Sequence, residues 1–401
     1  MIIAPADSTS AISSRHAKPV LVYLVTEDWY FLSHRLPMAR EALRAGFDIH
    51  VIANVNKGRA AIEAEGFFLH SVSWRRGSVN LFAFVAIIQE VRRLYKSIAP
   101  DIVHHVALQP TIVGSLAAAG LPFRRLNALA GLGYIFTSST LKARLMRPVL
   151  RAMLRYVLGH PNASVLVQNP DDRATVQNIG IPGNRIFIVP GSGVDTDALT
   201  PLPEPPGAVT VAFVGRLLDD KGVRNLVKAH EILDQRGHPI RLLIAGEIDP
   251  VNPASIPPQE VAEWGRHPGI DVLGHVADIR DVWRAAHIAV LPSRREGLPL
   301  SLLEAAACGR PIVATDVPGC REIAREGVNA LLVPPDDAEA LADAIGKLAA
   351  DAPLRARFGA ASRRIAEGEF SANSVGLQIV SLYKRLLEHS GRLLPLPPTG
   401  G

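Results

Sequence analysis

The chain has 401 residues, 48% of them hydrophobic and 20% charged, which is the balance of a globular protein with room for two or three domains. Its two cysteines, Cys308 and Cys320, exclude a disulfide-rich scaffold and fit no CxxC motif for metal or redox chemistry. Residues 1–17 contain no apolar signal-peptide core, and the most apolar run, Leu81–Ile88, is shorter than the ~20 residues that span a bilayer. We therefore expect a cytoplasmic protein without a membrane span.

Positive charge is concentrated in the first half of the chain. Residues 1–190 carry 21 Lys and Arg against 11 Asp and Glu, a net charge of +10, whereas residues 191–401 carry 22 against 27, a net charge of −5. Such asymmetry is typical of a protein with one half facing a polyanion. In Leu141–Gly159 five basic residues alternate with apolar ones at mostly three- and four-residue steps: Lys142, Arg144, Arg147, Arg151 and Arg155. This pattern predicts a basic amphipathic helix.

Two interpretations of this helix remain open. In the first it lies on an anionic membrane surface, held by its cations and by shallow insertion of Leu141, Leu145, Leu150 and Leu154. In the second it packs its leucine side on the protein and exposes its arginines to water. Nucleic acid is disfavoured as the polyanion because aromatic residues are not interleaved with the basic ones. We expect no nucleic-acid partner and a peripheral association with the inner face of the plasma membrane.

Strand-like and helix-like segments alternate through the first half. Val20–Val25 is a near-continuous apolar run of the kind found in buried parallel strands, and it is followed by a loop at Thr26–His34 and a helix at Arg35–Ala45. This alternation predicts βαβ units with right-handed crossovers, and hence an α/β domain with a parallel sheet. The further expected strands are Asp48–Ala53, Leu69–Val72, Ile102–His105, Ser164–Gln168 and Arg185–Val189, and the further expected helices are Leu81–Ile98 and Thr111–Ala119.

The segment Pro190–Gly207 is dense in Pro and Gly and predicts a linker. Beyond it the alternation restarts, so we expect two Rossmann-like domains, residues 18–190 and 208–370, joined by residues 191–207. In such sheets ligands bind at the carboxyl ends of the strands, here in a cleft between the domains. The expected strands of the second domain are Val209–Val214, Arg241–Ala245, Asp271–Leu273, Ile288–Leu291, Ile312–Thr315 and Ala330–Val333, and its expected helices are Gly222–Gln235, Ile279–Ala286, Pro299–Cys308 and Ala338–Ala350.

The segment Arg294–Thr315 is the most informative in the chain. Glu296 follows a strand, and Pro299 occupies the first position of the next helix, which proline favours. Free backbone N–H groups at Gly297–Leu300 and the positive end of the helix dipole predict a diphosphate site. Glu304 lies ~7–8 Å further along the helix axis. Two carboxylates therefore bracket the diphosphate, as the hydroxyl-rich rings of a nucleotide sugar require. The alternative for this segment by itself is one capping and one solvated glutamate.

A second motif, Gly215–Gly222 (GRLLDDKG), follows the first strand of the second half. Arg216 and Lys221 flank a turn at the carboxyl end of that strand, where they are suited to neutralise a diphosphate leaving group. A basic turn by itself is usually just solvated. This one, however, lies at the same sheet edge as Glu296, and we therefore infer a common site.

These motifs resemble the donor domain of the retaining glycosyltransferases of family 4, the group 1 family with the GT-B fold. The resemblance covers about residues 18–390 and implies an α/β structure of two Rossmann-like domains with parallel sheets facing a central cleft. It also implies that the helix Ala372–Glu388, within residues 371–390, crosses back onto the first domain. The matching motifs are E-x7-E at Glu296 and Glu304, G-R-x4-K-G at Gly215–Gly222, G-V-D at Gly193–Asp195, and a shortened V-x-x-L-G-x-V strand at Val272–Val276.

The resemblance implies roles for individual residues. Arg216 and Lys221 would hold the donor diphosphate, Glu296 the sugar hydroxyls and Glu304 the ribose. Catalysis would depend on Glu296, Arg216 and Lys221, and the backbone near His275 would meet the base. The other expected donor-binding residues are Gly215, Gly246, Gly297, Leu298, Pro299 and Leu300.

The first half departs from the family pattern. The segment Glu27–Arg35 after the first strand contains no glycine where the family has a Gly-rich loop, and Asn127–Gly133 contains no histidine where the family has its active-site histidine. We expect His105 as the catalytic substitute, with His34 as the other candidate on the acceptor side. The remaining expected acceptor-side residues are Trp29 and the pair Gly131 and Gly133, whose missing side chains would let the backbone approach the donor sugar.

The expected function is a hexosyltransferase that uses a nucleotide-diphosphate sugar, expected to be a UDP-sugar, with retention of configuration. Similarity of Trp29–Pro37 and Gly131–Thr137 to bacterial surface-glycan transferases implies a lipid-linked or oligosaccharide acceptor. Cationic side chains and a helix terminus would stabilise the leaving diphosphate, so no metal or other cofactor is expected. Two alternatives remain: a nucleotide-sugar 2-epimerase of the same fold, which the basic helix disfavours, and a non-catalytic nucleotide-sugar-binding partner subunit, which the intact carboxylate pair disfavours.

Overall fold

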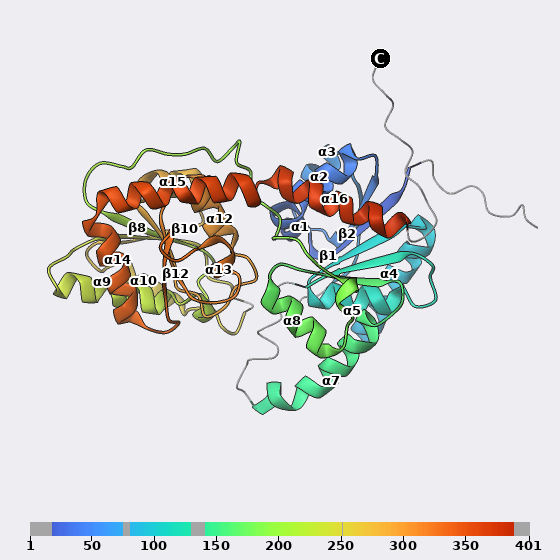
Figure 1. Ribbon diagram of the computed structural model, residues 1–401. Helices are drawn as coiled ribbons and strands as arrows, with labels where there is room; N and C mark the ends of the chain where they lie inside the picture. Colours follow the sequence, from blue (N-terminus) through green and yellow to red (C-terminus); the bar gives the residue numbers. More distant parts are fainter. Residues whose placement is uncertain (1–17, 75–80, 130–140, 251, 389–401) are drawn as a thin grey trace, which may run out of the picture.

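The computed structural model of the chain describes residues 18–74, 81–129, 141–250 and 252–388, with the backbone alone at 81 and 141–146. Two α/β domains lie side by side, and each contains one parallel sheet (Figure 1). The architecture of two Rossmann-like domains expected from the sequence is confirmed.

The first sheet has seven strands in the order β3-β2-β1-β4-β5-β6-β7, and all its pairings are parallel. Successive residues of β1 point to opposite faces. Leu21 and Tyr23 pack in one core cluster, whereas Val22 and Leu24 pack in another beneath α4 and α5. Both faces are therefore buried, which explains the continuous apolar run of this strand. The strands are β1 (Val20–Glu27), β2 (Asp48–Asn54), β3 (Phe68–Ser71), β4 (Ile102–Val106), β5 (Arg124–Ala128), β6 (Ala163–Val167) and β7 (Ile186–Ile188).

One segment of the first domain differs from the expectation. Most of Thr26–His34 is helical rather than a loop, because it forms the short helix α1. The buried carboxylate of Asp28 stabilises this start, since it accepts hydrogen bonds from the backbone N–H groups of Asn56 and Gly58, both at 2.7 Å. The helices of this domain are α1 (Asp28–His34), α2 (Leu36–Arg44), α3 (Arg59–Ala64), α4 (Leu81–Ile98), α5 (Leu108–Ala117), α7 (Leu141–Leu158) and α8 (Pro170–Ile179).

The second sheet has six parallel strands in the order β10-β9-β8-β11-β12-β13, around one continuous core. Its first strand, β8, lies in the middle, and the turn after it is therefore near the middle of the sheet edge. The strands are β8 (Thr210–Val214), β9 (Arg241–Ala245), β10 (Ile270–Gly274), β11 (Ile288–Leu291), β12 (Ile312–Thr315) and β13 (Ala330–Val333). The helices are α9 (Val223–Gln235), α10 (Pro258–Trp264), α11 (Ile279–Ala285), α12 (Leu300–Ala307), α13 (Cys320–Ile323), α14 (Ala338–Ala350) and α15 (Ala352–Glu369).

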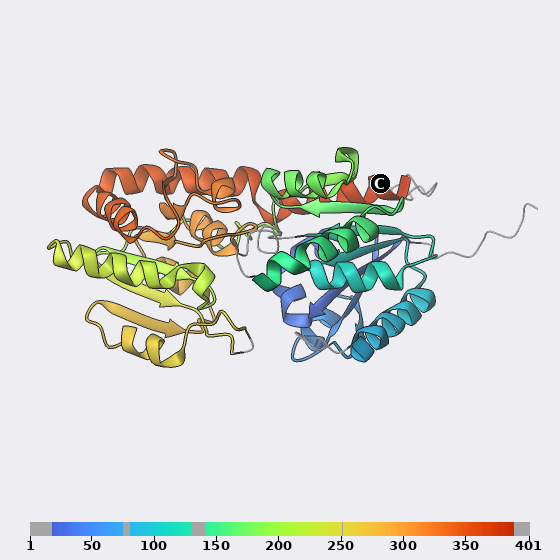
Figure 2. The same ribbon diagram turned by 90° about the horizontal axis from the view of Figure 1, so that it is seen from below.

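The last two helices connect the domains. Helix α15 packs on α12 of the second domain, and α16 (Ala372–Glu388) packs on α2 of the first, so the pair runs along one side of both domains (Figures 1 and 2). Tyr383 of α16 is fully buried in the first domain, where its hydroxyl lies 2.9 Å from that of Tyr23 and 2.7 Å from Nδ1 of His104. The end of the chain is thus part of the first domain's core. In the described residues, no helix is both long and apolar enough to span a membrane.

Candidate functional site

The two expected motifs of the second domain meet in one ion pair. Nζ of Lys221 lies 2.5 Å from Oε1 of Glu296, and the hydroxyl of Ser293 donates to the same oxygen at 2.6 Å. The pair is largely shielded from water, because the side chains of Lys221 and Glu296 are 22% and 9% exposed. Residues 75 positions apart therefore form one charged centre at the carboxyl end of the sheet.

Glycines make this close approach possible. Gly222 has a left-handed backbone (φ +71°), and a Cβ at this position would lie 2.0 Å from the carbonyl oxygen of Pro292. Gly246 has φ +147°, and its Cβ would lie 1.8 Å from the carbonyl oxygen of Gly215. Any larger residue at either position forces the turn after β8 away from the neighbouring loop.

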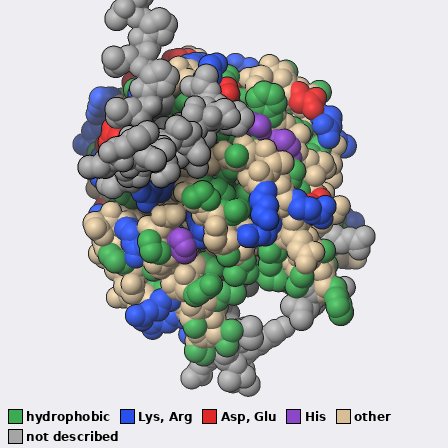
Figure 3. Space-filling model, turned by 90° about the vertical axis from the view of Figure 1, so that its right-hand side faces the viewer, with side chains coloured by type: hydrophobic (Ala, Val, Ile, Leu, Met, Phe, Trp, Pro, Cys, Tyr) green, Lys and Arg blue, Asp and Glu red, His purple; other side chains and the backbone are tan. Residues whose placement is uncertain are grey.

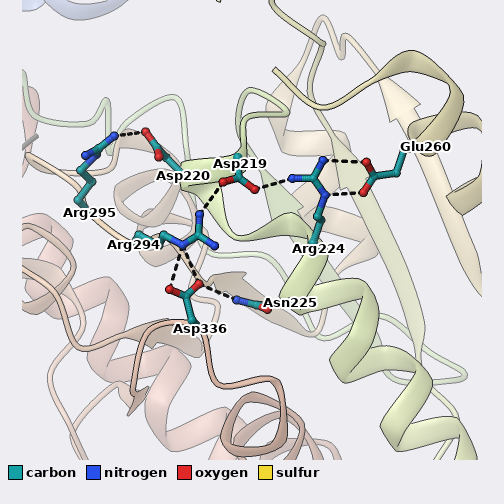
Figure 4. Close-up of polar contacts among 8 residues, drawn as sticks. All are labelled: Asp219, Asp220, Arg224, Asn225, Glu260, Arg294, Arg295 and Asp336. Carbon is teal, nitrogen blue, oxygen red and sulfur yellow. Dashed lines mark hydrogen bonds and ion pairs between the residues drawn. The ribbon is translucent and has the colours of Figure 1, made fainter. Parts of the chain in front are cut away.

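A network of ion pairs holds the two loops together around this centre (Figure 4). Asp219 pairs with Arg224 at 2.5 Å and with Arg294 at 2.6 Å, and Asp220 pairs with Arg295. The backbone N–H of Arg294 also donates to the carbonyl of Asp220 at 2.9 Å. The remaining contacts join Arg224 to Glu260, and Asp336 to both Arg294 and Asn225. Lys221 and Glu296 are consequently positioned by their immediate chain neighbours.

Arg216 lies at the same edge but is more accessible than Lys221. Its Nη1 is 3.1 Å from Oδ2 of Asp249, and its side chain is half exposed. Asp249 and Ser293 are contacts that the motif comparison missed, because neither lies within a matched motif. Arg216 keeps free donors for an anion, since a guanidinium carries five N–H groups.

The segment Gly297–Leu300 lies where the diphosphate site is expected. Helix α12 begins at Leu300, so Pro299 is its N-cap rather than its first residue. Asn169 of the first domain donates to the carbonyl of Gly297 at 3.0 Å, and this loop therefore contacts the first domain directly. Leu298 packs against the core of the second domain.

Glu304 lies on α12, one turn beyond its start. It is half-buried, and burial raises the pKa of its carboxyl group to about 8. A carboxyl group in this condition is uncharged at neutral pH unless donors stabilise its charge.

His34, at the end of α1, is the acceptor-side histidine that the structure brings to this centre. Burial, with the positive charges of Arg35, Arg216 and Lys221, lowers its pKa to about 4. The ring stacks on Tyr30 with centroids 4.3 Å apart, and its Nδ1 lies 2.6 Å from the hydroxyl of Ser33. A neutral imidazole is therefore held close to the cations of the other domain.

His105 does not reach this centre, and the expectation of a catalytic role for it is corrected. It is fully buried in β4, where Nδ1 lies 2.7 Å from Oδ1 of Asn127 and Nε2 lies 3.1 Å from the hydroxyl of Tyr95. Both ring nitrogens are occupied within the core. Helices pack on both faces of the sheet at β4. A residue near the end of this strand is therefore enclosed in the core and does not face the donor centre.

The other expected residues differ in their accessibility. Trp29 is partly exposed and packs edge-on against Tyr30, beside His34. His275 is exposed just after β10. Gly131 and Gly133 lie outside the described residues.

The basic helix expected from the sequence is α7, and its packing corrects part of the membrane interpretation. Leu154 is fully buried and Leu150 packs beside it, so these leucines are not available for insertion. Arg151 donates to the carbonyl of Asn178 in α8. The side chains of residues 141–146 lie outside the described part of the chain. Within residues 147–158, α7 packs its leucine side on the protein, in agreement with the second interpretation.

Comparison with known proteins identifies the fold and the chemistry. A family model described as "Glycosyl transferases group 1" matches residues 208–351, and one described as "Glycosyl transferase 4-like" matches residues 21–159. The chain belongs to the group 1 glycosyltransferases. The first match contains every expected donor-binding residue of this glycosyltransferase, from Gly215 to Glu304.

Relatives and solved structures agree with this assignment. The N,N'-diacetylbacillosaminyl-diphospho-undecaprenol alpha-1,3-N-acetylgalactosaminyltransferase of Campylobacter jejuni is 23% identical over 385 residues, covering 90% of this chain and 99% of the relative. The capsular polysaccharide biosynthesis glycosyltransferase CapM of Staphylococcus aureus is 28% identical over 180 residues, 45% of this chain and 47% of CapM. The structure of HepE from Anabaena with UDP-glucose has a TM-score of 0.71 at 17% identity, covering 91% and 99% of the two chains. This glycosyltransferase therefore has the GT-B fold.

Proposed function

We propose that this glycosyltransferase transfers a hexose-type sugar, with retention, from a UDP-sugar to a lipid-linked acceptor in the biosynthesis of a bacterial surface glycan. The observation that carries this proposal is the Lys221–Glu296 pair, with Arg216 beside it and His34 facing it. Cations, a carboxylate and a helix start within one centre suit a diphosphate joined to a sugar.

The residues divide the chemistry between them. The bond between the anomeric carbon and the diphosphate oxygen breaks, and the diphosphate keeps the electron pair. Arg216, Lys221 and the start of α12 stabilise that developing charge. The acceptor hydroxyl oxygen bonds to the anomeric carbon on the same face, and its proton passes to the leaving oxygen. Glu296 orients the sugar by accepting hydrogen bonds from its hydroxyl groups.

His34 is positioned to orient the acceptor rather than to hold charge. Its pKa of about 4 keeps the ring neutral at physiological pH, so it can accept a hydrogen bond from an acceptor hydroxyl. The partly exposed Trp29 lies beside it and offers a flat apolar surface to a sugar or a lipid chain.

The donor and acceptor classes are supported by named relatives. The Anabaena HepE structure is a complex with UDP-glucose, and the name of the Campylobacter enzyme includes an undecaprenol-linked acceptor. A lipid-linked acceptor requires the enzyme to work at a membrane surface. We propose the cytoplasmic face, and the positive first half favours an anionic leaflet.

The test is transfer of labelled sugar from a panel of UDP-, GDP- and ADP-sugars to a bacterial membrane extract. We expect label from a UDP-sugar in the lipid-extractable product, with the donor's anomeric configuration in its NMR spectrum. The control is Arg236→Ala, which removes two exposed ion pairs at the residue that follows the end of α9. An inverted product would contradict retention, and conversion of the donor without an acceptor would indicate the 2-epimerase.

A further inference from the structure

A pocket lies in the first domain, and neither Lys221 nor Glu296 lines it. It has a volume of about 560 Å³, which is within the size range of small-molecule sites. Helices α5, α7 and α8 end around it, and the segments that precede β6 and β7 complete its wall. Its strand residue, Arg125, is the second residue of β5. The pocket thus opens at the amino ends of the strands, whereas the donor centre faces their carboxyl ends.

The pocket wall is strongly cationic. Arg125, Arg155, Arg185 and His160 all line it, and none of the described residues that form its wall is acidic. Lys and Arg side chains also outnumber acidic ones on the end face of this domain (Figure 3). Three arginines within one small pocket repel one another unless an anion joins them.

Arg125 is the residue that most requires an anion. It is 2% exposed, and its Nε has no hydrogen-bond partner, while one of its terminal nitrogens donates to the carbonyl of Ala118 at 2.5 Å. Burying a guanidinium is costly unless an opposite charge compensates it. No carboxylate pairs with Arg125 in the described residues, so helix ends and a bound ligand are the remaining sources of negative charge.

Arg155 and Arg185 complete a convergent set of donors. Arg155 is exposed on α7 and lies over Gly180, whose missing side chain leaves room for the guanidinium, since a Cβ there would lie 3.3 Å from Cζ of Arg155. No hydrogen bond or ion pair joins Arg155 to another side chain among the described residues. Arg185 donates to the carbonyls of Gly159 and His160 at 3.2 and 2.9 Å, and this fixes its direction.

Capping of helix ends does not account for all of this charge. The three helices that end here, α5, α7 and α8, each contribute a partial charge of about −0.5. Their sum of about −1.5 is smaller than the three positive charges of the arginines. Arg125 and Arg185 each donate to carbonyls at helix ends. The Nε of Arg125 has no acceptor, and the guanidinium of Arg155 makes no hydrogen bond to another side chain among the described residues.

We propose that this pocket binds a phosphate group, presented either by the headgroup of an anionic phospholipid or by a free phosphate ester. A tetrahedral anion with several acceptor oxygens can join guanidinium groups that converge from different elements. Apolar side chains lie next to the site on the same helix: Val149 and Tyr156 of α7, seven residues apart and so on one face, are 59% and 74% exposed. Tyr156 also lines the pocket, so a hydrocarbon chain attached to the phosphate would meet an apolar surface.

The test uses the full chain and titrates inorganic phosphate by calorimetry at constant ionic strength. Arg155→Ala is the informative variant, because Arg155 is exposed and its loss leaves the fold intact. We expect it to weaken phosphate binding by about tenfold or more, the usual effect of losing a charged hydrogen bond. Arg59→Ala is the matched control, since it removes one exposed arginine from α3 of the same domain and should bind as the wild type does.

The source of the phosphate is distinguished by vesicles. Co-sedimentation with phosphatidylglycerol vesicles, compared with phosphatidylcholine vesicles, should be lost in Arg155→Ala if a lipid headgroup is the ligand. If Arg155→Ala weakens the binding of inorganic phosphate but leaves co-sedimentation with the vesicles unchanged, the ligand is a free phosphate ester. The proposal is overturned if phosphate binds no better than chloride, or if Arg59→Ala weakens binding as much as Arg155→Ala does. Sugar transfer from the nucleotide sugar is measured in parallel, and neither the phosphate titration nor the vesicle experiment depends on its result.

Discussion

The Lys221–Glu296 pair supports the sharpest prediction. Replacing Lys221 with Ala removes one of the cations expected to hold the diphosphate, and replacing Glu296 with Gln removes the charge expected to orient the sugar. Loss of one such contact in a transition state costs about 2.7–4 kcal/mol. We therefore expect each variant to lower kcat/KM by ~10²-fold or more, measured by transfer from the preferred nucleotide sugar.

The two variants differ in their effect on stability. Lys221→Ala leaves Glu296, which is 9% exposed, with the hydroxyl of Ser293 as its remaining partner within the described residues. A largely buried carboxylate that loses its cation costs about 1–3 kcal/mol. Glu296→Gln costs less, because Lys221 is 22% exposed and can reach water. Urea unfolding measures both differences.

A double variant tests whether the two groups act as one centre. Because each single change already breaks the pair, the double variant should lose less than the sum of the two, in rate and in stability. Arg236→Ala is the control, since its exposed ion pairs contribute at most ~1 kcal/mol and lie away from the centre. Near-normal turnover in both single variants, with folding intact, would refute the assignment.

The remaining predictions concern pH, metal and the turn after β8. The affinity for UDP should rise as the pH increases through about 8, where Glu304 loses its proton, and calorimetry should find this dependence abolished in Glu304→Gln. The free energy of unfolding should fall as the pH decreases from about 6.5 to 4. Burial lowers the pKa of His105 to about 4 in the folded chain, so over this range the unfolded chain binds a proton that the folded chain does not. A constant free energy of unfolding between about pH 7 and 5 in urea titrations would contradict this. Transfer should survive EDTA, since Arg216, Lys221 and the start of α12 replace a metal; loss of activity restored only by Mg²⁺ or Mn²⁺ would show otherwise. Gly222→Ala should lower both the melting temperature and the turnover, because its Cβ would meet the carbonyl of Pro292; unchanged values would exclude this role for the turn.

Much of the second domain was predictable because its signals are local. Strands such as Arg241–Ala245 and Ile288–Leu291 have the expected bounds, because a buried parallel strand has a nearly continuous apolar sequence between turns. The two motifs around Lys221 and Glu296 carry their chemistry within short, regular spacings. Helix α15 was not predicted, because its apolar residues are interspersed with many charged ones.

The first domain was less predictable, because its decisive features depend on distant contacts. The helix α1 depends on Asp28, whose carboxylate is held by backbone groups of Asn56 and Gly58. The two histidine candidates also look alike in sequence, as each follows a strand or lies at its end. His105 is buried against Tyr95 and Asn127 and is therefore not available to a substrate. His34 lies at the end of α1, close to the cations of the other domain.

The sequence by itself determined the α/β class and the alternation of most strands and helices, because these depend on periodicity within single segments. It also indicated the family, because the motifs that carry the resemblance are short and local. Only the tertiary structure decided which charges meet. Lys221 and Glu296 pair across 75 residues, α16 completes the core of the first domain, and Arg125 is buried without a carboxylate partner in the described residues. The reason is physical: the energy of a charge depends on its distance to other charges and to water, and folding sets both of those distances.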